Sequence, residues 1–208
     1  MVGIDEVGLS AIAGPIVIGA TRGPIPGKIE VKDSKQLKPQ ERLEIGKQLI
    51  EAQIDYSIII LFPQFVLHRS LVDAVMLGAY LALKELNVKP NERIIIDGKN
   101  NPKDYFKKHD SAIYDEIKSL EIIAMPKADE FIREVSAASI LAKIFRDKFM
   151  ELLHPFYPEY NWKQNKGYYS RRHFDEATKK MSFWHRERLI YQRKKHLQLK
   201  LLKEEKND

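Results

Sequence analysis

The sequence predicts an α/β protein in which one mixed sheet is flanked by helices. Three observations indicate this class. Short runs rich in β-branched residues alternate with longer segments of helical periodicity, only a turn separates the first two apolar runs, and helical segments separate the later ones. A turn suits antiparallel pairing, whereas a helix between two strands suits a parallel crossover. The expected order is strand, strand, helix, strand, then helix, strand, helix, strand, helix.

Five segments are predicted to be strands because they are short and apolar. A turn that contains Gly8 and Gly14 follows the first of them, and glycines and prolines mark residues 22–34 as a loop. The fourth strand ends at Asp97 and Gly98, a pair that is common in turns. The strands are expected at residues 2–6, 15–21, 54–61, 93–97 and 122–125.

Five longer segments are predicted to be helices. The first begins with Pro39, and the second begins at Ser70 with Asp73 three residues later, as in a capping box. The fourth has small residues near its centre, which allow a helix to lie close to a sheet. A loop rich in proline and aromatic residues is expected at 154–169. The helices are expected at residues 39–52, 70–87, 104–120, 132–153 and 171–181.

The composition of the 208-residue chain limits the possible classes. Lysine and arginine number 35 against 29 aspartates and glutamates, and this net charge of +6 fits both a polyanionic partner and an ordinary basic surplus. The absence of cysteine excludes disulfides and thiolate metal sites. There is no apolar run of about 20 residues and no signal-peptide pattern, so we expect no membrane association and a cytoplasmic location.

Acidic residues lie at or just past the carboxyl ends of three of the predicted strands: Asp5 with Glu6, then Asp97, then Asp129. Each alone is typical of a turn or a helix cap, but ligand sites form at this edge of an α/β sheet. Neighbouring strands would bring four carboxylates together, and a divalent cation would relieve their repulsion. Oxygen ligands suit Mg²⁺ or Mn²⁺, and such a cluster in a basic protein favours two-metal phosphodiester chemistry.

The adjacent acids Asp5 and Glu6 impose a geometric condition. Successive side chains of a strand point to opposite faces, so these two can share a metal site only if the strand ends or kinks there. Val7 and Gly8 permit such a change of direction.

Five motifs occur in a fixed order. They are GIDE…AGP from residue 3, DSKQL at 33–37, IIIDG at 94–98, KADEFIREVSAASILAKIFRD at 127–147 and YPEYNWKQNKGYYSRRHFDEA at 157–177. Together they resemble the motifs of ribonuclease HII, the type 2 branch of the ribonuclease H family, from residue 3 to about residue 188. The long fourth run makes the resemblance specific.

The resemblance implies a fold and a division of the chain. The fold is a ribonuclease-H-like mixed five-stranded sheet, with its first three strands antiparallel, flanked by helices and followed by a C-terminal helical appendage. Residues 1–153 would form the catalytic domain, and residues 154–208 a substrate-binding appendage packed on it.

The resemblance also implies an activity. The chain would be a metal-dependent endoribonuclease that hydrolyses the RNA strand of RNA–DNA hybrids and, as a further substrate, DNA with embedded ribonucleotides. Independently of the resemblance, we expect a monomer. Products would carry 5′-phosphate and 3′-hydroxyl ends. Catalytic and metal-binding roles, with two Mg²⁺ or Mn²⁺ ions, fall on Asp5, Glu6, Asp97 and Asp129. Nucleic-acid contacts fall on Gly8, Leu9, Ser10, Lys35, Ser139, Lys143, Lys166 and Tyr168. For Lys143, a purely structural role is an equal alternative.

The chain departs from the family pattern in two loops. The opening motif of the family usually continues with glycine, a basic residue and glycine, whereas Gly8, Leu9 and Ser10 stand here. Leu9 cannot pair with a phosphate, and Ser10 lacks the backbone freedom of glycine. Three interpretations of the altered loop stay open: the loop keeps its shape, the substrate preference has shifted, or the activity is weak. Tyr169 replaces the usual glycine, where it covers the loop or adds stacking surface.

Two other functions compete with the ribonuclease. A non-catalytic or weakly active nucleic-acid-binding protein of the same fold would explain the altered loop, but the retention of all four acids favours an enzyme. A nuclease that acts on DNA branches or ends is disfavoured by the DSKQL and SAASILAK motifs. The basic C-terminal segment is expected to pack its apolar face on the domain, with some lysines and arginines touching phosphate.

Overall fold

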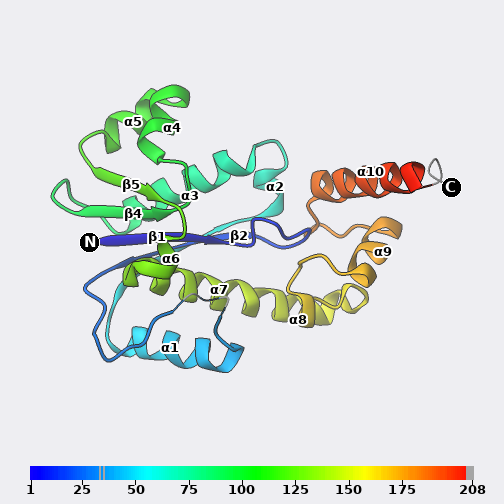
Figure 1. Cartoon of the computed structure of the whole chain (residues 1–208), viewed down its shortest axis with the longest axis horizontal. Coiled ribbons are helices and arrows are strands. Elements are labelled where there is room, and N and C mark those ends of the chain that lie inside the picture. Colours follow the sequence, from blue (N-terminus) through cyan, green and yellow to red (C-terminus); the bar gives the residue numbers. More distant parts are fainter. Residues whose placement is uncertain (33, 35, 205–208) are drawn as a thin grey trace.

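One mixed sheet of five strands forms the centre of the protein (Figure 1). The computed structural model describes residues 1–32, 34 and 36–204. The strand order is β3-β2-β1-β4-β5, with antiparallel pairing among the first three strands of the chain and parallel pairing of β4 with β1 and β5. This confirms the predicted sheet. The strands are β1 (Val2–Val7), β2 (Ile16–Arg22), β3 (Asp55–Leu61), β4 (Arg93–Asp97) and β5 (Glu121–Met125).

Helices cover both faces of the sheet. In Figure 1, α3, α4 and α5 lie on one face and α1 and α7 on the other, and each layer shares a buried apolar cluster with the strands. Two short 3₁₀ helices span His154–Phe156 and Pro158–Tyr160. The α-helices are α1 (Pro39–Glu51), α2 (Pro63–Val66), α3 (Leu71–Glu85), α4 (Pro102–His109), α5 (Ser111–Ile117), α6 (Ala128–Phe131), α7 (Arg133–Leu153), α8 (Trp162–Asn165), α9 (Arg171–Lys179) and α10 (Glu187–Glu204).

Two expectations about local structure were wrong. The helix expected at 104–120 is broken at Asp110, which has an extended backbone and whose side chain accepts hydrogen bonds from the amides of Ala112 and Ile113. An aspartate that caps a new helix ends the previous one, because its side chain competes with the helical backbone. The loop expected at 154–169 contains both 3₁₀ helices and α8.

Helix α7 lies unusually close to β1 and β2, as its small residues predicted. A Cβ atom on Gly19 would lie 2.4 Å from the Ala138 carbonyl oxygen, and one on Gly3 would lie 2.3 Å from the backbone of the same helix. Only glycine in the strand and small residues in the helix allow this approach. The close packing places Ser139 and Lys143 of α7 beside the carboxyl end of β1.

The C-terminal segment is joined to the loop that follows β1. Ala13 forms an isolated β-bridge with His185, and Ile12 packs in a buried cluster with residues of α9 and α10. Tyr169 packs against this cluster, with the guanidinium of Arg193 3.6 Å from the centre of its ring. Tyr169 thus covers the loop, which is the first of the two interpretations given for it. Within the described part of the chain, no helix is both long and apolar enough to cross a membrane.

Candidate active site

A cavity of about 470 Å³ opens at the carboxyl ends of β1 and β4. It gathers most of the residues that the sequence singled out, and the side chain of Leu71 at the start of α3 borders it as well. The predicted site residues that line it are Asp5, Glu6, Gly8, Leu9, Ser10, Asp97, Ser139, Lys143 and Tyr168. Lys35 lies outside the described residues.

The register of the sheet explains how Asp5 and Glu6 reach one cavity. The parallel ladder between β1 and β4 stops where Ile4 pairs with Ile96, while β1 continues beside β2 as far as Val7. The two acids therefore lie just past the last residue that β4 covers. The strand does not end at Glu6, as the expected bounds had it, and yet both acids border the cavity.

The four carboxylates interact electrostatically. Asp5 is only 5% exposed, and burial raises its pKa well above the ordinary value of 3.8. Repulsion by Glu6, and to a smaller degree by Asp97 and Asp129, raises this pKa further, whereas a hydrogen bond with Ser139 lowers it. Asp129 lies on the short helix α6 and is itself buried. It repels the Asp5 carboxylate electrostatically, although it does not line the cavity.

The donor set fits a hard divalent cation, although the side chains are turned to other partners. An oxygen of Asp97 accepts from the Ala128 amide (2.7 Å), and an oxygen of Asp5 accepts from the Glu6 amide (2.8 Å). Among the described residues, no three acidic or histidine side chains are placed to hold one ion together. A buried aspartate that three neighbouring carboxylates repel is an environment in which Mg²⁺ or Mn²⁺ relieves repulsion. Binding would require these side chains to turn toward the ion.

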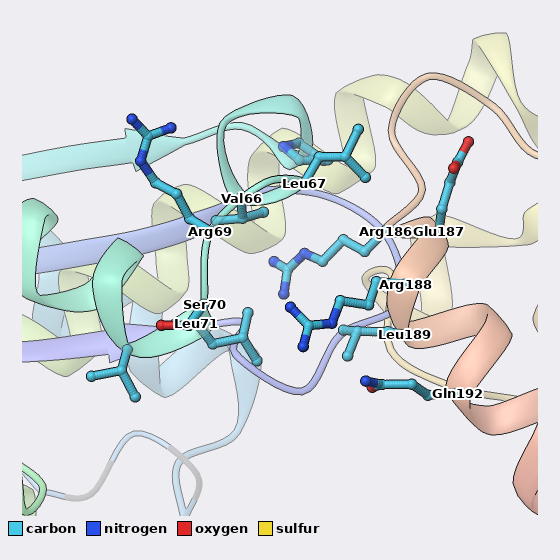
Figure 2. A pocket seen from close by; sticks show the side chains of 12 residues that line it. Val66, Leu67, Arg69, Ser70, Leu71, Arg186, Glu187, Arg188, Leu189 and Gln192 are labelled. Atoms are coloured by element: carbon cyan, nitrogen blue, oxygen red, sulfur yellow. The ribbon is translucent and has the colours of Figure 1, made fainter.

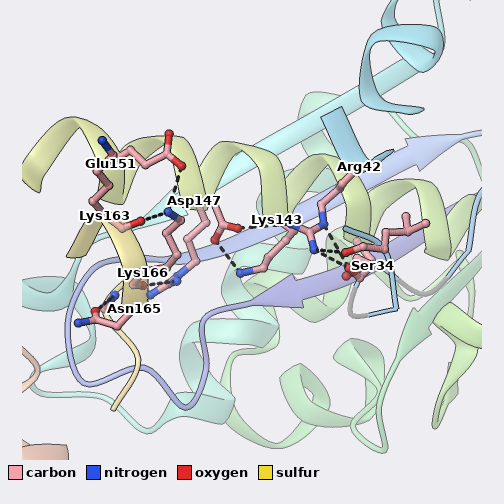
Figure 3. Close-up of polar contacts among 12 residues, drawn as sticks. Ser34, Arg42, Lys143, Asp147, Glu151, Lys163, Asn165 and Lys166 are labelled. Carbon is pink, nitrogen blue, oxygen red and sulfur yellow. Dashed lines mark hydrogen bonds and ion pairs between the residues drawn. The ribbon is translucent and has the colours of Figure 1, made fainter. Parts of the chain in front are cut away.

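A chain of polar contacts connects the cavity to the segment after β2 (Figure 3). The Lys143 ammonium donates to Asp147 (2.6 Å), which also lies 3.5 Å from the guanidinium of Arg42. Arg42 in turn donates to the carbonyls of Ser34 (2.8 Å) and Leu37 (2.9 Å). Burial lowers the pKa of Lys143, and the ion pair with Asp147 opposes this effect. Asp147 thus holds the Lys143 charge at the cavity and orients Arg42, which binds the carbonyls of Ser34 and Leu37.

Tyr168 lies between two cations. The Lys143 ammonium is 5.2 Å from the centre of its ring, and the Arg146 guanidinium is 4.8 Å from it. Arg146 is fully buried, and burial lowers its pKa. Its guanidinium donates to the carbonyls of Pro15 (2.9 Å), Lys166 (2.8 Å) and Ala13 (3.1 Å). Arg146 therefore joins the loop before β2 to the segment that carries Tyr168.

Lys166 is the predicted contact that the structure does not bring to the cavity. Its ammonium pairs with Glu151 at 3.0 Å and also donates to the carbonyl of Lys163. Only the backbone carbonyl of Lys166 is tied to the site, through its bond to Arg146.

A second buried arginine holds the altered loop. Arg186 donates to the carbonyls of Gly8 (2.8 Å) and Leu9 (3.1 Å), and twice to that of Gly14 (3.1 and 2.9 Å). Burial, and secondarily the charge of Arg146, lowers the pKa of Arg186 to about 9, so it remains charged at neutral pH. The carbonyls of the loop are thus fixed without help from any side chain of the loop itself.

Of the three residues Gly8, Leu9 and Ser10, only Gly8 has a backbone conformation that requires glycine. Gly8 has a φ of +95°, and a Cβ there would lie 2.1 Å from Nε of Arg146. Ser10 is not among the residues with positive φ, and Leu9 packs against the apolar core. The expectation that Ser10 sits where glycine's freedom is needed was therefore wrong, which favours the interpretation that the loop keeps its shape.

Two buried histidines hold the backbone at Tyr168. His173 Nδ1 donates to the Tyr168 carbonyl (2.9 Å), and its Nε2 accepts from Trp162 (3.0 Å) and lies 3.1 Å from Nε2 of His185. Nδ1 of His185 accepts from the Ser182 amide (2.9 Å), so its Nε2 carries the proton that is donated to His173. Burial lowers both pKa values, that of His185 to about 3, and both rings are neutral at pH 7.

We expect these histidines to make the protein less stable in mild acid. Their folded pKa values lie below the ordinary 6.5, so the unfolded chain binds more protons as the pH falls from 6.5, and the free energy of unfolding decreases. Urea unfolding at about pH 7.5 and about pH 5 should show a smaller acid-induced loss for His185→Gln than for the parent. The exposed control His68→Gln should keep the parental loss. Equal losses in both variants would contradict the role of the buried pair.

The sequence motifs did not point to Arg42, Arg146, Arg186 or the histidine pair as parts of the site. A usable signal exists for the first two, because each lies on the buried face of its helix. Arg42 shares that face with Gly46 and Leu49 of α1, and Arg146 follows Ala142 by one turn on α7. A charged residue at a core position is rarely tolerated unless its donors are satisfied by partners.

The fold and the site define a class. A five-stranded sheet in the order 3-2-1-4-5, with interacting carboxylates at the carboxyl ends of its central strands, is the architecture of ribonuclease-H-like nucleases. The sequence model of the family described as ribonuclease HII matches residues 2–194. The chain belongs to this ribonuclease HII family, whose members are ribonuclease H enzymes. The resemblance seen in the motifs is thereby confirmed.

Individual relatives agree with this assignment. The ribonuclease HII of Christiangramia forsetii is 35% identical over 173 residues, which cover 82% of this chain and 80% of the relative. The crystal structure of ribonuclease H2 from Pyrococcus horikoshii superposes with a TM-score of 0.70 and 30% identity, covering 92% of this chain and 97% of that one. The fold is shared with Bst RNase HIII in complex with Mn²⁺, at a TM-score of 0.70 and 24% identity, over 91% of this chain and 63% of that one.

Proposed function

We propose that the chain is a metal-dependent endoribonuclease. It cuts the RNA strand of RNA–DNA hybrids and duplex DNA that contains ribonucleotides, leaving 5′-phosphate and 3′-hydroxyl ends. The observation that carries this proposal is the electrostatic coupling of four carboxylates beside a cavity that also contains Lys143 and Tyr168. Membership of the ribonuclease HII family supports the reaction class.

The four carboxylates are the proposed ligands of Mg²⁺ or Mn²⁺. When two such ions are bound, they supply an activated water and stabilise the charge that develops on the leaving 3′-oxygen. Before binding, the acids store repulsion, which is evident in the raised pKa of Asp5.

The remaining residues of the cavity bind and orient the nucleic acid. Lys143, held by Asp147, presents a charge to a phosphate group. The ring of Tyr168 packs against a nucleotide next to the cut. Because the carbonyls of Gly8 and Leu9 are bound to Arg186, the N–H groups of this loop are the ones that remain to meet a ribose 2′-hydroxyl.

Cleavage of end-labelled duplexes tests the proposal. An RNA–DNA hybrid, a DNA duplex with one ribonucleotide and an all-DNA duplex are incubated with Mg²⁺ or Mn²⁺ and the parent protein, Asp97→Asn or the exposed-acid control Asp104→Asn. We expect cutting only of the duplexes that contain ribonucleotides, by the parent and the control. Loss of cutting in Asp97→Asn would support the acid cluster. Binding of these duplexes without metal-dependent cutting by the parent would favour the alternative of a non-catalytic nucleic-acid-binding protein.

The altered loop gives a separate prediction. Leu9→Arg combined with Ser10→Gly places a cation at the cavity and restores the family's usual pattern, and an added phosphate contact is worth about 1 kcal/mol, or roughly fivefold. We expect kcat/KM on the single-ribonucleotide duplex to rise by about that factor, with a smaller rise on the hybrid. The two substrates are compared at equal ionic strength. No gain on the single-ribonucleotide duplex would contradict the idea that this loop limits recognition.

The domain boundary at residue 153, the monomeric state and a cytoplasmic location stay predictions. Size-exclusion chromatography with light scattering measures the second of these directly.

A further inference from the structure

A second cavity, of about 240 Å³, lies between the α2–α3 turn and the first turn of α10 (Figure 2). Its walls are largely apolar, with Val66 and Leu67 on one side and Leu189 on the other. Leu71 lines both this cavity and the catalytic cavity. The two cavities are therefore neighbours that share this residue.

Arginine side chains from the start of α10 charge this cavity. Figure 2 shows the guanidinium groups of Arg186 and Arg188 directed into it, with Gln192 one turn further along the helix. Glu187 also lines the cavity, but its carboxylate is directed away from it. Ser70, the N-cap of the 15-residue helix α3, borders the same space, so the positive end of that helix adds to the field.

The arginines of this region have different tasks. Arg186 is occupied by the carbonyls of the loop after β1, and Arg193 lies on the ring of Tyr169. Arg69 lies over the ring of Phe65 and points away from the cavity. Arg188 is exposed, and within the described residues it forms no ion pair. Its guanidinium is therefore the one available to an anion that enters the cavity.

We propose that this second cavity is a subsite for the sugar–phosphate backbone of the nucleic-acid substrate. One phosphodiester group binds Arg188 and Gln192, and the adjoining sugar packs on Leu71 and Leu189. The proposal rests on the proposed function, and it adds a second binding cavity for the same nucleic-acid substrate. Two features carry it: the continuity with the catalytic cavity through Leu71, and a guanidinium that faces apolar walls and, among the residues that the structure describes, pairs with no carboxylate. A charge-assisted hydrogen bond to a phosphate is stronger than a neutral one.

Binding of Arg188→Ala tests this subsite. The matched control is Arg93→Ala, which removes the same charge from an exposed arginine at the amino end of β4, the end opposite the catalytic cavity. Fluorescent DNA duplexes with one ribonucleotide are titrated in EDTA over a series of salt concentrations, and they are shortened stepwise from either side of the ribonucleotide. Steady-state cleavage with Mg²⁺ follows on the same duplexes.

We expect Arg188→Ala to weaken binding roughly tenfold at low salt and to reduce the slope of log K against log salt by about 0.9, the loss of one phosphate contact. The loss should vanish when the duplex is shortened on one side and persist when it is shortened on the other. KM should rise while kcat stays within about twofold. Arg188→Lys, which keeps the charge, should retain the slope.

Three results would overturn the subsite. The first is a slope of log K against log salt that is equal for Arg188→Ala and Arg93→Ala. The second is a loss of binding in Arg188→Ala that is the same whichever side of the ribonucleotide is shortened. The third is that inorganic phosphate stabilises the parent but not Arg188→Ala, while both proteins bind the duplex equally. This result would indicate a site for free anions. If the parent cuts ribonucleotide-containing duplexes in these cases, only the subsite fails. If the parent neither binds nor cuts them, the proposed function itself fails.

Discussion

Asp5→Asn is expected to reduce kcat/KM on the RNA–DNA hybrid by on the order of 1000-fold and, at the same time, to stabilise the metal-free protein. Loss of one carboxylate removes several kcal/mol of charge stabilisation by bound ions, and about 4 kcal/mol corresponds to this factor. Without ions, the same carboxylate is a buried charge repelled by Glu6, Asp97 and Asp129. Asparagine keeps the shape and the acceptor for the Glu6 amide, so the substitution removes the buried charge together with its repulsion.

The sign of the pH dependence follows from the raised pKa. The folded protein holds the Asp5 proton more tightly than the unfolded chain, so ionisation costs stability as the pH rises above the ordinary value of 3.8. The stability gain of Asp5→Asn should therefore be absent in strong acid and grow with pH. Urea unfolding in EDTA measures it, with the exposed acid Asp104→Asn as the control that should show no gain. A variant less stable than the parent at neutral pH in EDTA would contradict the stored repulsion.

Arg146→Met is expected to lower the free energy of unfolding by about 3 to 5 kcal/mol, or the Tm by roughly 10 °C. Methionine fills much of the same volume, but it leaves the carbonyls of Ala13, Pro15 and Lys166 without their donors. It also removes the cation on one side of the Tyr168 ring. Well below the Tm, KM should therefore rise more than kcat falls, since the binding segment loosens while the acids stay in place.

Helix α7 supplies a matched control for this prediction. Arg133 also donates to two backbone carbonyls, those of Pro26 (3.0 Å) and Ile29 (2.8 Å), but it is exposed to water. Water replaces its hydrogen bonds when it is removed, so Arg133→Met should cost only about 1 kcal/mol. Differential scanning calorimetry compares the two variants. Equal losses of stability would show that the buried position of Arg146 carries no special weight.

Local patterns determined the strands, whereas the topology of the sheet was implied by the resemblance of the motifs. Each strand is a short apolar run, and residues that are common in turns, such as Asp97 with Gly98, mark where it ends. The helix expected at 104–120 failed on a competing local signal, because Asp110 caps a second helix with its own side chain. The small residues of α7 correctly predicted that this helix lies close to the sheet, where it contacts Gly3 and Gly19.

The motifs determined the family, and they located the acids at strand ends without showing that these interact. That interaction was decided by the parallel pairing of β1 with β4, which joins segments about 90 residues apart and stops just before Asp5. The tertiary structure alone also decided the roles of Arg146 and Arg186. A buried guanidinium is stable only where distant backbone carbonyls converge on it, and no local pattern records that convergence. The sequence by itself thus determined where most helices and strands lie and which acids are the candidate ligands. Long-range strand pairing and burial decided which groups meet at the site.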